Sequence, residues 1–127
     1  MIPKFRVWLP DQDVERMLRV KALVFEHDKT RCVCGYAYDF YLEDEDATIM
    51  QSTGLYDKNG KEIFEGDIVK MAKDVYSDPT YYEVIRHRGG AYRLESNQHG
   101  CELWLRHTNC EVIGNVYENP ELLEVTE

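Results

Sequence analysis

The 127-residue sequence has no long apolar run, and no hydrophobic segment approaches the roughly 20 residues that cross a bilayer. Residues 1–6 also lack the apolar stretch and the small-residue cleavage site of a signal peptide. We therefore expect no membrane partner and a cytoplasmic location.

The sequence motifs of common catalytic and nucleotide-binding sites are missing as well. The chain contains no G-x-x-x-x-G-K-S/T or G-x-G-x-x-G loop for phosphate, no H-E-x-x-H motif for zinc and no G-x-S-x-G turn for a serine nucleophile. No other pattern supplies a nucleophile with its base, or a metal cage at credible spacing. The sequence therefore predicts a protein that is not an enzyme and has no cofactor.

Positive charge is scarce, because 15 Lys and Arg stand against 24 Asp and Glu, a formal net charge of −9. Nucleic-acid phosphates repel a chain with this balance, which disfavours nonspecific nucleic-acid binding but leaves a local basic face open. The acid gathers in residues 26–49 and 110–127.

Cysteine is limited to Cys32, Cys34, Cys101 and Cys110. Zinc ribbons and fingers use two closely spaced pairs of ligands, whereas one residue separates the first pair here and eight separate the second. On a strand, the first two thiols would point to the same side and form half a metal site. The spacing favours reduced thiols that act as small hydrophobes.

Short apolar runs separated by Gly, Asn and Asp dominate the sequence. Alternation predicts strands over residues 5–9, 17–25 and 32–41. Residues 17–25 partly fit helical spacing too, but their late β-branched residues favour a strand. The third strand is predicted to carry one aromatic face, formed by Tyr36, Tyr38 and Phe40.

Turn signals are denser in the second half of the chain. Asn59-Gly60 predicts a hairpin, and Gly89-Gly90 predicts another between strands at 81–86 and 91–95. Gly66 allows a turn before a buried strand. The other elements expected are a strand that opens at 68–69, strands over 48–51, 102–105 and 111–117, a bulge or close contact at Gly114, and one helical turn at 119–123.

Regularly spaced short strands with Gly-centred turns indicate a mainly β fold, as a small barrel or a strongly bent sheet. The acidic segment 42–47 is the internal boundary that the composition suggests. It would separate an irregular β-rich N-terminal part, residues 1–47, from a barrel-like part, residues 48–127, which is large enough to fold alone.

Three segments resemble one known family. Residues 4–8, 50–69 and 110–123 are similar to the YopX family of small proteins encoded by phages and prophages. The resemblance implies a single YopX-like unit over residues 1–127, with an SH3-like barrel in the β-rich part at 48–127. It also implies a phage or prophage origin, in the cytoplasm of a bacterial host cell. The family has no established biochemical activity, so the resemblance implies none for this chain.

Two acidic residues beside Gly66 are a candidate site. Glu65 and Asp67 could project two carboxylates for a divalent cation or for acid–base chemistry. A carboxylate beside glycine more often accepts hydrogen bonds from turn amides, and we expect that role for Asp67.

The densest basic region outside the N-terminus surrounds Gly89-Gly90 and is interleaved with aromatic residues. Cations beside aromatics suit stacking on single-stranded nucleic acid, or a pocket for an acidic partner. An ordinary charged rim on a half-buried hairpin is the structural alternative. The residues predicted to bind a partner are Arg86, His87, Arg88, Tyr92, Arg93 and Trp104.

These observations support three functional hypotheses. The first is a non-enzymatic module that binds a host or phage protein through an aromatic-rich surface. The second is a nucleic-acid-associated accessory protein that acts through the basic hairpin at residues 86–93. The third is that the acidic run at 43–46 imitates DNA and occupies the basic groove of a host protein. The structural alternative for this run is a solvated loop. The edge strands of a small β domain also leave homo-oligomer formation open.

Overall fold

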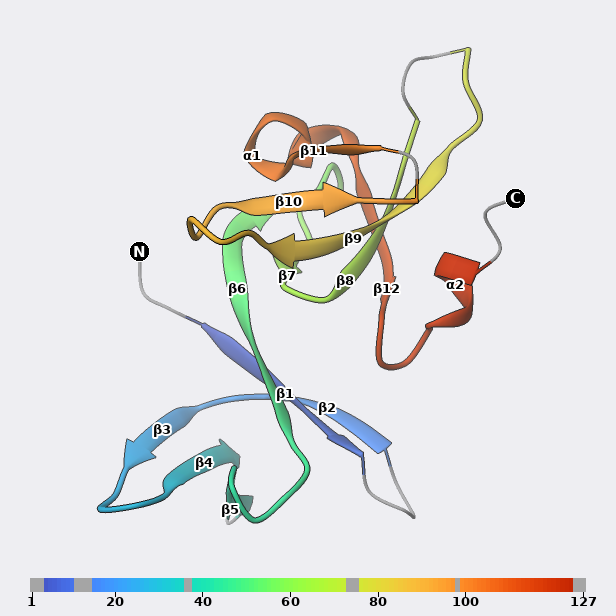
Figure 1. The fold of residues 1–127 in the computed structure, drawn as a ribbon. Coiled ribbons are helices and arrows are strands. Elements are labelled where there is room, and N and C mark those ends of the chain that lie inside the picture. The colour runs from blue at the N-terminus through green and yellow to red at the C-terminus, as the bar shows by residue number, and fades with distance from the viewer. Residues whose placement is uncertain (1–3, 11–14, 36–37, 73–75, 98, 125–127) are drawn as a thin grey trace. The chain divides into compact units, whose positions relative to one another are not determined.

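Strands make up most of the structure, which confirms the mainly β prediction. The computed structural model describes residues 4–10, 15–35, 38–72, 76–97 and 99–124 (Figure 1). The chain divides into two compact units, Met1–Gln51 and Ser52–Glu127. The division falls inside strand β6 (Thr48–Tyr56), whose first half pairs in the first unit and whose second half pairs in the second.

The first unit is built on strand β1 (Phe5–Pro10), which confirms the strand predicted at 5–9. It pairs antiparallel with β2 (Glu15–Arg19) on one side and with the first half of β6 on the other. Val7 lies opposite both Leu18 and Ile49 and is fully buried. The buried apolar residues of this unit are Val7, Trp8, Leu9, Cys32 and Met50.

Two of the strands predicted in this unit are wrong, because each is divided in two. Residues 17–25 fall into β2 and β3 (Ala22–Phe25). The Val20 N–H donates to the Phe5 carbonyl at 3.0 Å, whereas the next N–H, of Lys21, donates to the Val33 carbonyl at 2.7 Å. The backbone therefore changes its pairing partner between two adjacent residues, which side-chain alternation does not reveal.

Residues 32–41 likewise form two strands, β4 (Thr30–Gly35) and β5 (Tyr38–Tyr41). These strands pair antiparallel with each other, and β3 lies on the other side of β4. The rings of Tyr38 and Phe40 have centroids 5.8 Å apart, so these two residues share a face as predicted. Tyr36, the third member of the predicted face, lies outside the described residues.

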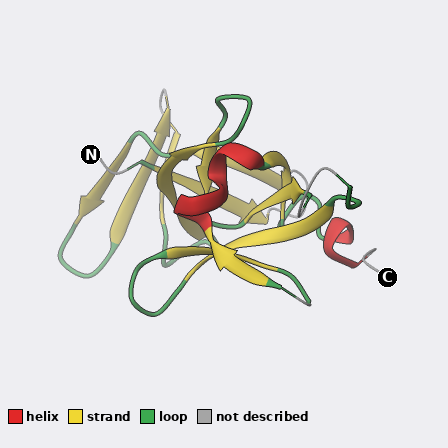
Figure 2. Cartoon of the chain, turned by 90° about the horizontal axis from the view of Figure 1, so that it is seen from above, coloured by secondary structure: helices red, strands yellow, loops and turns green. Residues whose placement is uncertain are grey.

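The second unit contains a five-stranded antiparallel sheet that curls into a half-barrel (Figure 1, Figure 2). Its strands lie in the order β11-β10-β9-β8-β12. The second half of β6 pairs separately with β7. The strands are β7 (Glu62–Phe64), β8 (Asp67–Met71), β9 (Thr80–Arg86), β10 (Tyr92–Glu95), β11 (Gly100–Glu102) and β12 (Glu111–Asn115).

Both hairpins predicted from glycine in this unit are confirmed. Tyr56 pairs with Glu62 across the Asn59-Gly60 turn, and Gly60 has a φ of 82°. The second hairpin joins β9 to β10, and Gly90 has a φ of 93°. These positive φ values are accessible to glycine at little steric cost. Local turn chemistry therefore fixes the two hairpins.

The core of the second unit lies against the curled sheet. Leu103, at the start of helix α1 (Leu103–Arg106), is completely buried in it. The strand predicted over 102–105 is wrong, because β11 ends at Glu102 and the helix follows. A strand would bury Leu105 together with Leu103, but Leu105 is 58% exposed. The core residues are Ile63, Val69, Met71, Tyr82, Val84, Leu94, Leu103 and Cys110.

The last strand, β12, carries the irregularity predicted at Gly114. Its pairing register with β8 shifts between Val112 and Gly114, and a Cβ at Gly114 would lie 2.8 Å from Asn119 Cγ. The strand is shorter than the predicted 111–117, because the Asn115 Oδ1 accepts the N–H groups of two following residues and turns the chain. Helix α2 (Glu121–Glu124) confirms the C-terminal helical turn.

Gly114→Ala is expected to lower the free energy of unfolding by about 1–3 kcal/mol, because the added methyl group forces the Asn119 side chain out of place. Chemical denaturation measures the loss. Gly89→Ala is the matched control, since nothing lies within 4 Å of a Cβ at Gly89. Equal effects of the two substitutions would contradict the close approach at Gly114.

Candidate functional site

The turn of the β9–β10 hairpin presents three of the predicted partner-binding residues to solvent. Arg86 ends β9 opposite Tyr92, and the turn closes through a 2.7 Å bond from the His87 N–H to the Ala91 carbonyl. Arg86, His87 and Arg88 are all exposed. Neither arginine has a hydrogen-bond or ion-pair partner among the described residues. Their charges are therefore available to a ligand.

Tyr92 has a different position from the turn residues. Its side chain is half-buried and packs against the core of the second unit. Burial raises the pKa of Tyr92, the Glu65 charge raises it further, and the Arg86 charge lowers it. The ring supports the sheet, while the hydroxyl lies within the electrostatic reach of Arg86.

Arg93 is engaged by the protein itself. Its Nε lies 2.8 Å from the Glu95 carboxylate, and its Nη1 lies 2.6 Å from the Glu102 carboxylate on β11. The hydrogen bond to Glu95 is the largest of the effects that raise the pKa of Arg93. Because both carboxylates already neutralise this cation, it contributes to the sheet rather than to the exposed turn.

Trp104 belongs to α1, and this helix lies near the start of β10 (Figure 1). In the antiparallel pairing of β10 with β11, Arg93 lies opposite Glu102. Helix α1 begins at the next residue and therefore starts beside the first residue of β10. Trp104 is 63% exposed, and its neighbour Leu105 is exposed to a similar extent.

The backbone of Tyr56, at the end of β6, lies near the residues that follow α1. The Nδ1 of His107, in the short helix η1 (His107–Asn109), lies 2.8 Å from the Tyr56 carbonyl oxygen. The Tyr56 side chain is itself exposed. We call Tyr56, Trp104 and Leu105 the α1 patch. The sequence analysis missed Tyr56 and Leu105, because a strand at 102–105 would have turned Leu105 inward.

The carboxylate pair at Glu65 and Asp67 does not form an exposed site. Asp67 is 2% exposed, and its Oδ2 accepts the Phe64 N–H at 2.7 Å. This bond confirms the turn role predicted for Asp67. Glu65 is half-buried, and its negative charge helps to raise the pKa of Tyr92.

The cysteines are free thiols, buried at Cys32 and Cys110 and half-buried at Cys34 and Cys101. The Sγ atoms of Cys32 and Cys34 lie 3.7 Å apart, which confirms that they point to the same side of their strand. Burial raises the pKa of Cys32, and likewise that of Cys110, to about 12. Within the described segments, no group of three or more His, Cys, Asp or Glu side chains could hold a metal ion.

The acidic run at 43–46 is partly engaged within the first unit. The Asp44 carboxylate lies 2.9 Å from the Lys29 Nζ, and Glu43 accepts the Thr30 N–H at 2.8 Å. The Thr30 N–H bond is the main cause of a lowered pKa at Glu43. Two of the four acids therefore hold the loop against β4, and DNA imitation stays a prediction.

The comparison with known families identifies the chain. A family model described as YopX protein matches residues 4–124, nearly the whole length. The chain belongs to the YopX family. This confirms the resemblance drawn from residues 4–8, 50–69 and 110–123. A bilayer-spanning helix is not found in the part of this YopX-family chain that the structure describes.

Individual relatives agree with the family assignment. The chain is 32% identical over 71 residues to the SPbeta prophage-derived uncharacterized protein YopX of Bacillus subtilis (strain 168), and it spans about half (52%) of that protein's length and 51% of its own. The crystal structure of protein EF1440 from Enterococcus faecalis matches with a TM-score of 0.62 and 31% identity, over 97% of this chain and 99% of that one. The crystal structure of yopX from Bacillus subtilis, 24% identical, matches with a TM-score of 0.67 over 94% and 97% of the two chains and supports the same fold.

Proposed function

We propose that this YopX-family chain is a non-enzymatic protein-binding module. Its contact surface is the β9–β10 turn, with Arg86, His87 and Arg88, together with the α1 patch. The observation that carries the proposal is the position of two unpaired arginines at the end of the sheet where an exposed Trp104 also lies. Trp and Arg are the side chains most enriched among residues that dominate binding energy.

The chemistry of this surface favours a partner that offers carboxylates beside apolar side chains. Arg86 and Arg88 can pair with carboxylates, while Trp104 and Leu105 bury apolar area. Arg93 is already neutralised, which leaves the hairpin with fewer cations than the sequence suggests. The net charge of −9 repels a polyanion such as nucleic acid, so these observations favour a protein that offers a few local carboxylates beside apolar side chains.

Four further proposals accompany this one. The curled antiparallel sheet supports an SH3-like barrel in the second unit. The prophage origin named for the Bacillus subtilis relative supports a phage or prophage origin and action in the bacterial cytoplasm. The edge strands β11 and β12 support self-association, which light scattering of the purified protein tests. The protonated thiols, which are poor nucleophiles, support a role without catalysis.

Trp104→Ala is expected to weaken partner binding by about 30-fold, the usual effect of removing a central aromatic residue. The test is affinity capture of the tagged full chain from lysogenic host cells with quantitative mass spectrometry, followed by titration of the recovered partner. Phe25→Ala is the matched control, because Phe25 is an exposed aromatic residue of the first unit.

Three outcomes of this experiment are decisive. A protein partner that is lost with Trp104→Ala and kept with Phe25→Ala supports the proposal. Equal recovery with both variants overturns it. Recovery that disappears after nuclease treatment also overturns it, and indicates instead a nucleic-acid-associated accessory protein that uses the basic hairpin at residues 86–93.

A further inference from the structure

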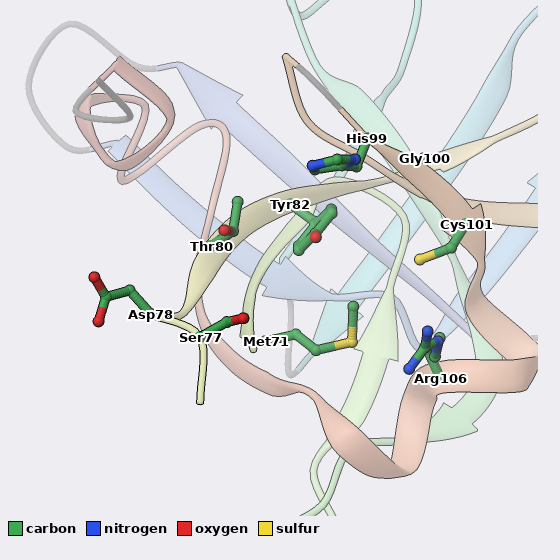
Figure 3. A pocket seen from close by; sticks show the side chains of 9 residues that line it. All are labelled: Met71, Ser77, Asp78, Thr80, Tyr82, His99, Gly100, Cys101 and Arg106. Carbon is green, nitrogen blue, oxygen red and sulfur yellow. The ribbon is translucent and has the colours of Figure 1, made fainter. Parts of the chain in front are cut away.

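A pocket of about 350 Å³ opens in the second unit, apart from the β9–β10 turn (Figure 3). Its walls come from β8, from β9 and the residues before it, and from the consecutive elements β11 and α1. Figure 3 shows the side chains of Tyr82, Cys101 and Arg106 around one hollow, with His99 and Met71 beside them. The volume lies at the lower end of the roughly 300–1,000 Å³ typical of small-molecule sites.

Tyr82 supplies a hydrogen-bond donor to this pocket. Its side chain is only 5% exposed, and its hydroxyl has no hydrogen-bond partner among the residues that the structure describes. Burial raises the pKa of Tyr82 more than the nearby Arg106 lowers it, so the hydroxyl keeps its proton at neutral pH. The hydroxyl lines the open pocket and is free to donate a hydrogen bond to an acceptor that binds there.

Arg106 supplies a positive charge to the same space. It is the last residue of α1, is half-buried, and has no ion-pair partner within the described ranges. Its charge lowers the pKa of Tyr82 and of Cys101 against the larger effect of burial, so its field reaches both groups. The neighbouring carboxylates of Glu95 and Glu102 are occupied by Arg93.

The other lining groups limit the ligand. Asp78 contributes a negative charge to the lining, while Met71 and Cys101 offer apolar surface. The Cys101 thiol is protonated, because burial raises its pKa. The pocket therefore suits a ligand with an anionic group at the Arg106 side and a small apolar body.

We propose that this pocket binds a small organic anion whose carboxylate or phosphate oxygens accept hydrogen bonds from the Tyr82 hydroxyl and the Arg106 guanidinium. The proposal is independent of the protein-binding surface, since it involves neither Arg86 nor Arg88 nor the exposed side chains of the α1 patch. It assigns a binding role to Arg106, to which the sequence analysis gave none.

The first test measures binding of inorganic phosphate and of succinate by calorimetry, at constant ionic strength with chloride as the background anion. We expect at least one of them to bind, with phosphate favouring a phosphate ligand and succinate a carboxylate ligand. Arg106→Gln should weaken binding by about tenfold or more and Tyr82→Phe by about three- to tenfold. Lys58→Gln removes an equal charge at the exposed β6–β7 turn, outside the pocket, and should change the affinity by less than about twofold.

The second test locates the bound anion. Cys101 lines the pocket and Cys34 lies in the first unit, so a saturating anion should slow alkylation of Cys101 by iodoacetamide and leave Cys34 unchanged. Failure of both anions to bind would overturn the proposal. So would an equal loss of affinity in Lys58→Gln and Arg106→Gln, or binding that leaves Cys101 unprotected.

Discussion

Asp57→Ala is expected to lower the free energy of unfolding by about 3 kcal/mol or more, because it leaves three backbone N–H groups without their acceptor. The Asp57 Oδ1 accepts the N–H groups of Asn59 and Lys61 at 2.9 and 2.8 Å, within the β6–β7 turn. Its Oδ2 accepts the Val112 N–H of β12 at 2.8 Å. One side chain that is 6% exposed thus joins a hairpin turn to the last strand of the sheet.

Denaturant titration of the variant measures this loss. Asp46→Ala is the control, because Asp46 is an exposed carboxylate and its removal should change stability by less than about 0.5 kcal/mol. Asp57→Asn keeps one acceptor oxygen and should fall between the wild type and Asp57→Ala. Similar stability of Asp57→Ala and Asp46→Ala would show that the turn amides find other acceptors.

The same carboxylate predicts a response to acid. Burial alone would raise the pKa of Asp57, but the N–H groups of Val112, Lys61 and Asn59 outweigh it, and the pKa lies below its usual value of 3.8. A lowered pKa contributes stability that is present above the unfolded-state pKa and is lost as pH falls through the folded-state pKa. As the pH is lowered through the folded-state pKa of Asp57, the free energy of unfolding should therefore fall less in Asp57→Asn than in the wild type.

The second large effect is expected in alkali and involves the two buried thiols. Burial raises the pKa of Cys32 and of Cys110 from 9.0 to about 12. Between these two pKa values the folded state holds protons that the unfolded state releases. The contribution of the buried thiols to stability is therefore complete below the unfolded-state pKa and declines as the pH rises toward the folded-state pKa. Each thiol should lower the free energy of unfolding by about 1.4 kcal/mol per pH unit in this range.

Urea titrations at several pH values above the pKa of an unburied thiol measure how steeply the free energy of unfolding falls with pH. Cys110→Ala removes one titrating group and should reduce the slope by about 1.4 kcal/mol per pH unit, whatever it does to stability at neutral pH. It also removes the 3.3 Å bond from Sγ to the His107 carbonyl, so the comparison depends on slopes and not on absolute values. Identical slopes in the variant and the wild type would refute the prediction.

The parts of the fold that sequence predicted are those decided by a few adjacent residues. Asn59-Gly60 and Gly89-Gly90 each determine a turn, because glycine accepts positive φ. Asp67 was predicted to accept a turn amide for the same local reason. Gly114, an isolated glycine in an apolar run, correctly indicated a bulge and a close contact.

The parts that sequence did not predict depend on distant pairing. Nothing near Val20 and Lys21 shows that their amides pair with different strands. The role of Arg93 depends on its register opposite Glu102, nine residues away. The Arg106 pocket depends on side chains from four elements, so no local spacing could reveal it. Site residues are therefore harder to predict here than turns.

Strand β6 has a consequence for dissecting the protein. Strand β6 runs from Thr48 to Tyr56 and pairs with β1 over its first half and with β7 over its second, so this interval contains no exposed loop. A protease that nicks exposed loops should release no fragment ending between residues 48 and 56 from the native chain. Fragments designed to begin or end in that interval would expose unpaired strand edges, and such edges invite aggregation.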